Sequence, residues 1–236
     1  GPHRWDSLKS LVDRYKGQYA IGVHLNDVLS IPRNLMGFEE LMMAFAEEPE
    51  LVSGLVEMSV DLNIELAAEA ARHGADFVFT GDDFSSADGP FMSPDTFREL
   101  MYPGFKRVIR GFREHGMPVI KHTDGNIMPI LDQLVEGPPD ALHSLDPQGG
   151  VDMAEVKRRV GDRVSLVGNV NCGLLDTGTD AECVENAQYA LKHGMPGGGY
   201  IFSTSNCVYT GMPLRRYELI HQVWRREGNY DDAGQQ

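Results

Sequence analysis

The sequence contains few cysteines, few basic residues and no long apolar run. Its three cysteines are too few, and odd in number, for a disulfide framework, which favours a reduced, intracellular compartment. The 21 Lys and Arg residues are outnumbered by 35 Asp and Glu residues, and the net charge of −14 argues against nucleic-acid or anionic-membrane partners. No stretch approaches the roughly 18 apolar residues that a membrane span needs, and residues 1–6 lack the apolar segment of a signal peptide. We therefore expect a cytoplasmic protein.

The residues that are present favour one globular domain. With 236 residues, 42% of them hydrophobic, the chain is long enough for a sizeable core, and we expect a single domain over residues 1–236. One unit repeats along it: a helical stretch ends in glycine, a short apolar strand follows, and polar residues come next. This pattern predicts parallel strands joined by crossover helices. The expected strands are 20–25, 76–80, 118–122, 141–145, 164–169 and 200–204.

Glycines mark the expected helix ends. A helix C-cap needs a positive φ, which glycine adopts without steric cost, and one glycine occupies this place in each repeat. These glycines are Gly74, Gly116, Gly137, Gly161 and Gly194. A helix start is marked by Ser93 as the N-cap, with Pro94 at the first helical position. The boundaries of the repeats are therefore set by local residue chemistry.

The repeats predict an α/β protein of the (β/α)8 barrel type. A closed barrel has eight strands, and the six expected here leave two N-terminal βα units to lie upstream of residue 1. The edge of an incomplete barrel is an aggregation liability unless it is covered, so we also expect a homo-oligomer or a second chain. An open doubly wound sheet is the alternative architecture that six strands allow.

Polar residues cluster where the expected strands end. Both architectures place the working face at the carboxyl ends of the strands, and the strand-to-helix loops would collect these residues around one mouth. Asp and Asn also cap helices, and this alternative applies to Asp27, Asp146 and Asn169. The candidate substrate-binding residues are Asp82, Asp83, Asn126, Asp146, Asn169 and Asn206.

The candidate catalytic residues are His122 and Asp124, and the candidate metal ligands are these two residues and Cys207. On an extended segment residues i and i+2 point to the same side, so His122 and Asp124 can address one point. Cys207 follows a different strand. One histidine, one carboxylate and one thiolate make an open zinc site, with a fourth position for water or substrate. Alternatively, His122 and Asp124 form an acid–base pair, and Cys207 is a buried small apolar residue.

Several motifs follow one another in a recognisable order. They are Gly81-Asp82-Asp83-Phe84, Phe91-Met92-Ser93-Pro94, Tyr102-Pro103, His122-Thr123-Asp124-Gly125-Asn126, Val167-Gly168-Asn169-Val170 and Asn206-Cys207. Together the motifs resemble the superfamily of uroporphyrinogen decarboxylase and the cobalamin-dependent methyltransferases that share its barrel. With the flanking elements, the resemblance extends over residues 20–226. It implies the barrel fold of that superfamily.

The resemblance also implies a choice between two branches. The methyltransferases hold zinc on a His-x-Cys pair and a later Cys; here His122 matches the histidine, Cys207 matches the later cysteine, and Asp124 replaces the middle cysteine. A carboxylate is also a zinc ligand. The decarboxylases need no cofactor, place an Arg-rich N-terminal segment against the substrate carboxylates, and have a histidine where Cys207 stands. This sequence shows neither feature.

We therefore expect a zinc-assisted methyltransferase that works with a corrinoid (cobalamin) protein. His122, Asp124 and Cys207 would hold the zinc, Asp82 and Asp83 would bind substrate or complete the metal shell, and the partner protein would carry methylcobalamin. The other partner would be a small-molecule methyl donor or acceptor. The alternatives are a cofactor-free, decarboxylase-like lyase and a catalytically silent binding module.

Overall fold

The computed structural model describes residues 3–230 and divides into two compact units. Of the described residues, unit 1 comprises 3–84, 91–122 and 130–140, and unit 2 comprises 85–90, 123–129 and 141–230. Within the units, each of the strands β1, β2, β5, β6, β7 and β8 pairs in parallel with a neighbour. The single barrel domain stays a prediction, and each unit is described by itself.

Unit 1 contains three strands that belong to the predicted repeats. They are β1 (Gly22–Leu25), β2 (Phe77–Gly81) and β5 (Val119–Thr123), the last residue of which belongs to unit 2. β2 pairs in parallel with both β1 and β5. Along β2, Val78 and Thr80 are buried, whereas Phe77 and Phe79 on the other face are half-buried. The predicted strands 20–25, 76–80 and 118–122 are confirmed, with ends that differ by one or two residues.

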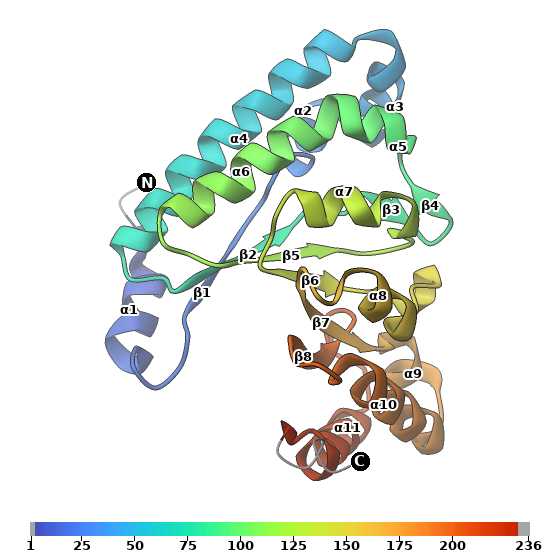
Figure 1. The fold of residues 1–236 in the computed structure, drawn as a ribbon. Coiled ribbons are helices and arrows are strands. Elements are labelled where there is room, and N and C mark those ends of the chain that lie inside the picture. The colour runs from blue at the N-terminus through green and yellow to red at the C-terminus, as the bar shows by residue number, and fades with distance from the viewer. Residues whose placement is uncertain (1–2, 231–236) are drawn as a thin grey trace. The chain divides into compact units, whose positions relative to one another are not determined.

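The described part of unit 1 also contains α-helices. They are α1 (Asp6–Tyr15), α2 (Ser30–Met36), α3 (Phe38–Glu47), α4 (Pro49–Arg72), α5 (Pro94–Thr96), α6 (Tyr102–Glu114) and α7 (Leu131–Glu136). A π-helical turn (Phe97–Met101) joins α5 to α6, and a 3-10 turn (Met128–Ile130) precedes α7. The long helices α4 and α6 lie side by side (Figure 1). They approach closely because Gly104 of α6 has no side chain: a Cβ there would lie 2.5 Å from Val56 of α4.

Unit 2 repeats the same plan. Its parallel strands are β6 (Ala141–Ser144), β7 (Ser165–Val170) and β8 (Tyr200–Thr204), as predicted. Its helices are α8 (Met153–Val160), α9 (Cys172–Thr177), α10 (Asp180–Gly194) and α11 (Leu214–Glu227), with a 3-10 turn at Pro147–Gly149. A short antiparallel hairpin of β3 (Ser85–Ser86) and β4 (Gly89–Pro90) was not predicted. α10 and α11 lie side by side (Figure 1).

All five predicted glycines lie at or next to the ends of helices, but only two of them have the positive φ that was expected. Gly74 and Gly116 have φ of 93° and 78°, as a C-cap requires. Gly137 and Gly161 are right-handed helical, with φ of −66° and −67°, and Gly194 lies within α10. Close packing explains two of the three, because a Cβ on Gly137 would lie 2.2 Å from the Phe105 ring and one on Gly194 would lie 2.6 Å from the Tyr200 ring. The Ser93 N-cap is confirmed by a 3.0 Å bond from the Thr96 N–H to its hydroxyl.

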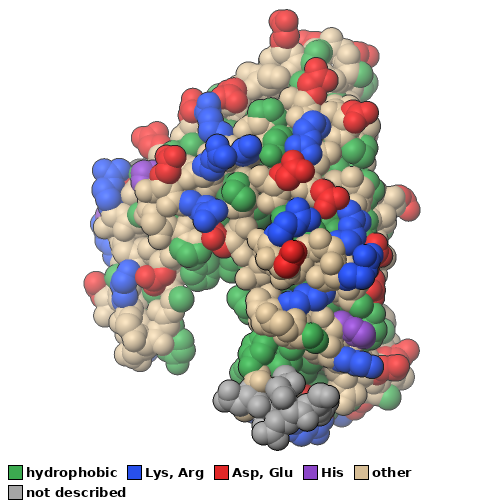
Figure 2. Space-filling model, viewed as in Figure 1, with side chains coloured by type: hydrophobic (Ala, Val, Ile, Leu, Met, Phe, Trp, Pro, Cys, Tyr) green, Lys and Arg blue, Asp and Glu red, His purple; other side chains and the backbone are tan. Residues whose placement is uncertain are grey.

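The surface of unit 1 mixes charges of both signs. Figure 2 shows Lys and Arg side chains interspersed with Asp and Glu over α4 and α6. On these helices Arg107 pairs with both Glu57 and Asp61. Acidic neighbours therefore interrupt the positive charge that a nucleic-acid footprint needs. No helix within residues 3–230 is long and apolar enough to cross a membrane.

Candidate functional site

Two of the predicted site residues meet in unit 1. Asp83 follows the end of β2, and His122 lies on β5 opposite Gly81 of β2. Asp83 Oδ1 is 3.6 Å from His122 Nε2, and both side chains are partly exposed. The parallel register therefore brings together a carboxylate and an imidazole that are 39 residues apart in the sequence.

The separation of these two atoms suits metal ligation. Zinc binds histidine nitrogen and carboxylate oxygen at about 2.0–2.2 Å, so two ligand atoms of a tetrahedral site lie about 3.3–3.5 Å apart. The observed 3.6 Å needs only a small adjustment. Asp83 and His122 thus fit a cation site, and the same geometry without a cation suits an acid–base pair.

A row of three rings runs across β1, β2 and β5 on this face. The Phe79 ring stacks on the His122 ring with 5.7 Å between centroids, and the His24 ring lies 6.2 Å from Phe79 on its other side. A Cβ on Gly81 would lie 2.3 Å from His24 Nε2, so glycine at this position makes room for the His24 ring. His24 is a candidate site residue that the sequence analysis missed. The sequence indicated only that His24 lies in a strand. Which residues lie next to it depends on the pairing of that strand with β2, which the sequence does not show.

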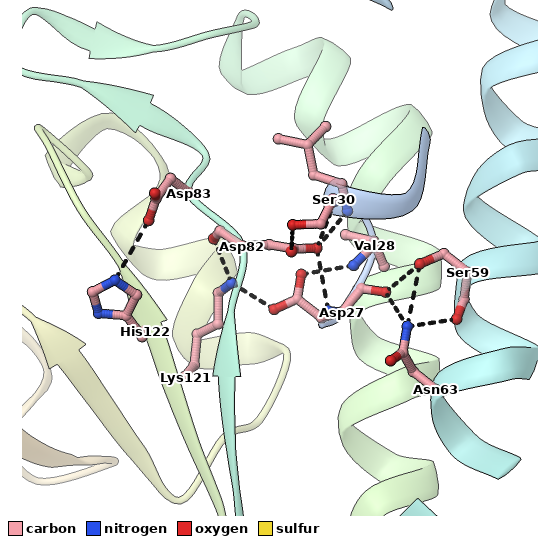
Figure 3. A network of polar contacts seen from close by, with 10 residues as sticks. Asp27, Val28, Ser30, Ser59, Asn63, Asp82, Asp83, Lys121 and His122 are labelled. Carbon is pink, nitrogen blue, oxygen red and sulfur yellow. Dashed lines mark hydrogen bonds and ion pairs between the residues drawn. The ribbon is translucent and has the colours of Figure 1, made fainter. Parts of the chain in front are cut away.

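Lys121, Asp27 and Asp82 form a buried polar cluster in unit 1 (Figure 3). Lys121 Nζ donates to Asp27 Oδ2 at 2.5 Å and to the main-chain oxygen of Asp82 at 2.7 Å. The Phe84 ring centroid lies 4.1 Å from the same nitrogen. Lys121 and Asp27 are 0% exposed and Asp82 is 1% exposed, so this cluster has no contact with solvent. Charged residues are almost never buried so completely unless they are paired.

The Asp82 carboxylate serves the start of α2. It accepts hydrogen bonds from the N–H groups of Asp27, Leu29 and Ser30 and from the Ser30 hydroxyl. Helix capping was the alternative role for Asp27, but Asp82 performs it for α2. Its negative charge at the start of the helix also complements the helix dipole. Because these donors occupy both carboxylate oxygens in the interior, the structure gives no support to the predicted substrate-binding role of Asp82.

The two buried carboxyl groups differ in protonation. Burial raises the pKa of Asp27 to about 8, with Lys121 opposing the rise and Asp82 adding to it. Burial also acts to raise the pKa of Asp82, but Lys121 and the hydrogen bonds from Asp27, Ser30 and Leu29 lower it overall. Burial thus favours the protonated form of Asp27, whereas Lys121 and the hydrogen bonds favour the ionised form of Asp82.

In unit 2, Asn206 links two other predicted site residues, Asp124 and Cys207. Its side-chain nitrogen donates to Asp124 Oδ2, and its side-chain oxygen accepts from the Cys207 N–H at 2.6 Å. The main chain of Asn206 also contacts Cys172 Sγ, at 3.2 Å from its nitrogen and 3.1 Å from its oxygen. Burial raises the pKa of the Cys172 thiol, despite the hydrogen bond to Asn206. Cys207 itself is exposed, which excludes the alternative of a buried apolar residue.

The remaining predicted substrate-binding residues hold local structure in unit 2. Asp146 caps the 3-10 turn through a 2.9 Å bond from the Gln148 N–H, so its capping alternative is confirmed. Asn169 is buried and donates to the Leu145 carbonyl at 2.9 Å, so it does not cap a helix. Asn126 Oδ1 accepts from the Met128 N–H at 3.2 Å. Substrate binding by these three residues stays a prediction.

The sequence matches a known protein family over nearly its whole length. The family model described as "Uroporphyrinogen decarboxylase (URO-D)" matches residues 2–226. The chain belongs to the uroporphyrinogen decarboxylase family. The resemblance inferred from the sequence motifs is therefore confirmed.

The curated relatives of this chain are named as two kinds of enzyme. It is 31% identical over 172 residues to a uroporphyrinogen decarboxylase from Thioalkalivibrio sulfidiphilus, a match that covers 70% of this chain and 45% of that protein. It is 26% identical over 176 residues to the methylcobamide:CoM methyltransferase MtaA of Methanosarcina barkeri, with 72% and 50% covered. The chain spans about half the length of the curated relatives it matches. These identities show the superfamily and leave the reaction to be proposed.

A solved structure confirms the fold of this chain. A methyltransferase from Methanosarcina mazei matches it with a TM-score of 0.82, at 20% identity, over 95% of this chain and 64% of that one. The predicted α/β barrel fold is therefore confirmed, and the open doubly wound sheet is set aside. At 20% identity the likeness shows the fold alone.

Proposed function

We propose that this chain is part of a zinc-assisted methyltransferase that works with a corrinoid protein. The proposal depends on the Asp83–His122 pair, whose oxygen and nitrogen lie 3.6 Å apart at the carboxyl ends of β2 and β5. Catalytic residues of barrel enzymes come from these strand ends. The match to a methylcobamide:CoM methyltransferase supports a methylated cobalamin as one reactant and a thiol as the other.

His122 and Asp83 would hold the metal from unit 1. Asp124 lies two residues after His122 in the chain, so we propose its carboxylate as a third ligand. Cys207, the later cysteine of the family's zinc pattern, is the fourth candidate. An aspartate and a thiolate each bring one negative charge, so replacing the middle cysteine by Asp124 conserves the charge of the ligand set. A bound zinc ion lowers the pKa of a thiol or of water and thereby supplies a nucleophile at neutral pH.

The neighbouring residues orient the imidazole. The Phe79 ring stacks on the His122 ring and limits its rotation, which keeps Nε2 directed at Asp83. His24, at the far end of the row of rings, is exposed, and a substrate on this face of unit 1 would find it as a hydrogen-bond donor or acceptor.

Metal content and methyl transfer test the proposal together. The whole protein, purified without chelator, should contain near-stoichiometric zinc. It should also transfer the methyl group of methylcobalamin to a thiol, which the cobalamin absorbance spectrum reports. Replacing His122 with Ala should abolish both properties. A parent protein that binds no zinc, or that loses its zinc without a change in transfer rate, would contradict the proposal.

A cofactor-free decarboxylase is the second candidate. It is favoured by the 31% identity to a curated uroporphyrinogen decarboxylase. In that case Asp83 and His122 would act as an acid–base pair. Decarboxylation of uroporphyrinogen by chelator-treated protein would establish this candidate in place of the methyltransferase. If the protein has neither activity, the remaining hypothesis is a catalytically silent binding module.

We also propose that a partner chain covers the unpaired edge of strand β1. Among the described residues β1 pairs with β2 alone, and a bare edge strand is an aggregation liability. A second copy or another chain would cover it. Light scattering of the purified chain should therefore give a mass above 26.1 kDa, the mass of one copy. A stable monomer with this edge bare would contradict the expectation.

A further inference from the structure

We propose that Lys121, Asp27 and Asp82 form a buried clamp that positions Asp83 and His122. In this assignment Lys121 and Asp27 are positioning residues, because both are 0% exposed and act through the residues next to them. The effect of the clamp on metal binding rests on the proposed function, whereas its effect on the geometry of the pair does not.

The clamp acts on the peptide group that leads into Asp83. The oxygen that accepts from Lys121 at 2.7 Å is the main-chain oxygen of Asp82, and this oxygen belongs to the peptide unit between Asp82 and Asp83. A fixed donor therefore fixes the plane from which the Asp83 side chain departs. Lys121 is itself the residue before His122 on β5. One ammonium group thus holds the backbone next to both members of the pair.

The clamp and the pair lie on opposite sides of the strands. Successive side chains of a strand point to opposite faces. Lys121 is fully buried, whereas His122 is partly exposed and faces Asp83 (Figure 3). Asp82 and Asp83 divide in the same way, one buried in the interior and one partly exposed. The site therefore has a reactive face and a fixed polar support behind it.

The ammonium group of Lys121 has a defined position. Two of its N–H bonds point to oxygen atoms, of Asp27 and of the Asp82 main chain, and the Phe84 ring lies 4.1 Å from the nitrogen. Donors that are satisfied in an apolar interior hold their geometry firmly, because each lost hydrogen bond would leave a buried polar group unpaired.

The clamp is anchored to the helical layer. The main-chain oxygen of Asp27 accepts from the Ser59 hydroxyl of α4 at 2.7 Å, and Asn63 of the same helix donates to the Ser59 carbonyl at 2.9 Å (Figure 3). The Asp82 carboxylate binds the start of α2. Strand ends that would otherwise move as loops are therefore tied to two helices.

A contribution to stability alone does not account for this arrangement. Well-packed apolar residues often stabilise an interior as well as buried charges do, so burial of ions is weak grounds for a purely stabilising role. What hydrogen bonds add is direction. Residues that orient metal ligands in this way typically change metal affinity about 10–100-fold when they are replaced.

A matched pair of variants at Asp27 tests the clamp in the whole protein. Asp27→Asn keeps a side-chain oxygen that accepts from Lys121, whereas Asp27→Leu is of similar size and has no acceptor. Val119→Ala is the control for general destabilisation, because Val119 is a fully buried residue of the same strand β5 and makes no side-chain hydrogen bond. Each variant is titrated with Co²⁺, whose visible spectrum reports ligand geometry, and its metal-free crystal structure is determined.

Asp27→Leu should weaken Co²⁺ binding about 10–100-fold and alter the visible spectrum. In its metal-free crystals the contact between Asp83 and His122 should be lost. Asp27→Asn and Val119→Ala should keep the parent affinity, spectrum and contact. If the Leu variant does not fold, Ser30→Ala, which removes one hydroxyl from Asp82, should shift affinity in the same direction by a smaller factor.

Equal affinity and an unchanged Asp83–His122 contact in the Leu variant would overturn the clamp. A parent protein that binds no Co²⁺ or Zn²⁺ would instead overturn the proposed function. In that case the metal-free crystal structures still decide the clamp, because the contact between Asp83 and His122 is measured without a metal.

Discussion

Lys121 Nζ lies 2.5 Å from Asp27 Oδ2, although the two residues are 94 positions apart in the sequence and neither is exposed. The contact joins β5 to the loop after β1. It links two segments whose polar residues appear unrelated in the sequence, and it places a cation beneath the strand ends that carry the candidate site.

Lys121→Met should strongly destabilise the protein. It leaves the Asp82 carboxylate buried without its cation, and removing one partner of a buried ion pair costs about 3–5 kcal/mol. Asp27→Asn keeps the oxygen that accepts from Lys121 and should change the unfolding free energy by about 1 kcal/mol or less at neutral pH. Urea unfolding of the parent and both variants measures the difference. If the two variants have equal free energies of unfolding, the charge of Lys121 does not stabilise the protein as argued.

The protonation of Asp27 should make stability fall as pH rises from 6.5 to 8. Its pKa is about 8 in the folded chain and 3.8 without the fold, so in this window the folded state binds a proton that the unfolded state has lost. The contribution is fully present below pH 3.8 and is lost as pH rises through about 8. The slope for one such group is at most about 1.4 kcal/mol per pH unit.

Asp27→Asn is the control for this pH dependence. The amide imitates the protonated carboxyl and does not titrate, so the unfolding free energy of this variant should be flatter between pH 6.5 and 8. Burial lowers the pKa of His143 from 6.5, so the stability change linked to that residue is centred below pH 6.5 and has the opposite sign, a rise of stability with pH. A slope that persists unchanged in Asp27→Asn would assign the effect to another group.

Single ligand replacements should release the metal and leave the fold. His122→Ala, Asp83→Asn and Cys207→Ser remove groups at strand ends rather than in the core, so elemental analysis should show lost zinc while circular dichroism stays unchanged. Asp88→Asn, which replaces an exposed carboxylate in the β3–β4 turn, is the matched control and should retain the parent zinc content.

Asp124→Cys should bind zinc at least as tightly as the parent, because it restores the ligand pattern of the methyltransferases. If the parent binds no zinc and Asp124→Cys acquires it, the protein has left the metal-dependent branch. His122 would then be better interpreted as half of an acid–base pair.

Two glycine-to-alanine changes on neighbouring helices should have opposite effects. A Cβ on Gly104 would lie 2.5 Å from Val56, so Gly104→Ala should force α4 and α6 apart and destabilise by about 1–3 kcal/mol. Gly54 lies in the middle turns of α4 and is exposed to solvent, and a Cβ there would have no atom within 4 Å. Gly54→Ala should therefore stabilise the protein by about 0.5–1 kcal/mol. Thermal unfolding of both variants gives the sign. A stabilised Gly104→Ala would contradict the close packing of these helices.

The sequence predicted the elements of the fold well, because their signals are local. An apolar run of five or six residues between a helix and a polar cluster is a strand wherever it packs, and all six predicted strands are present. Ser93 caps its helix through a neighbour three residues away. Gly137 and Gly194 lie at helix ends as predicted, but the positive φ expected there was wrong. A ring from another element approaches each of these glycines closely, and no local sequence pattern reveals such a contact.

The candidate site was only partly predictable. Sequence alone determined that His122 and Asp124 lie two residues apart at the end of a strand, and that polar residues follow the other strands. Only the tertiary structure decided between two adjacent aspartates: Asp83 faces His122, whereas Asp82 is buried with Lys121. It also brought His24 beside Phe79. The physical reason is that strand pairing and helix packing bring together segments that are far apart in the chain. These contacts decide which face of the sheet a side chain lies on and which partner it meets there.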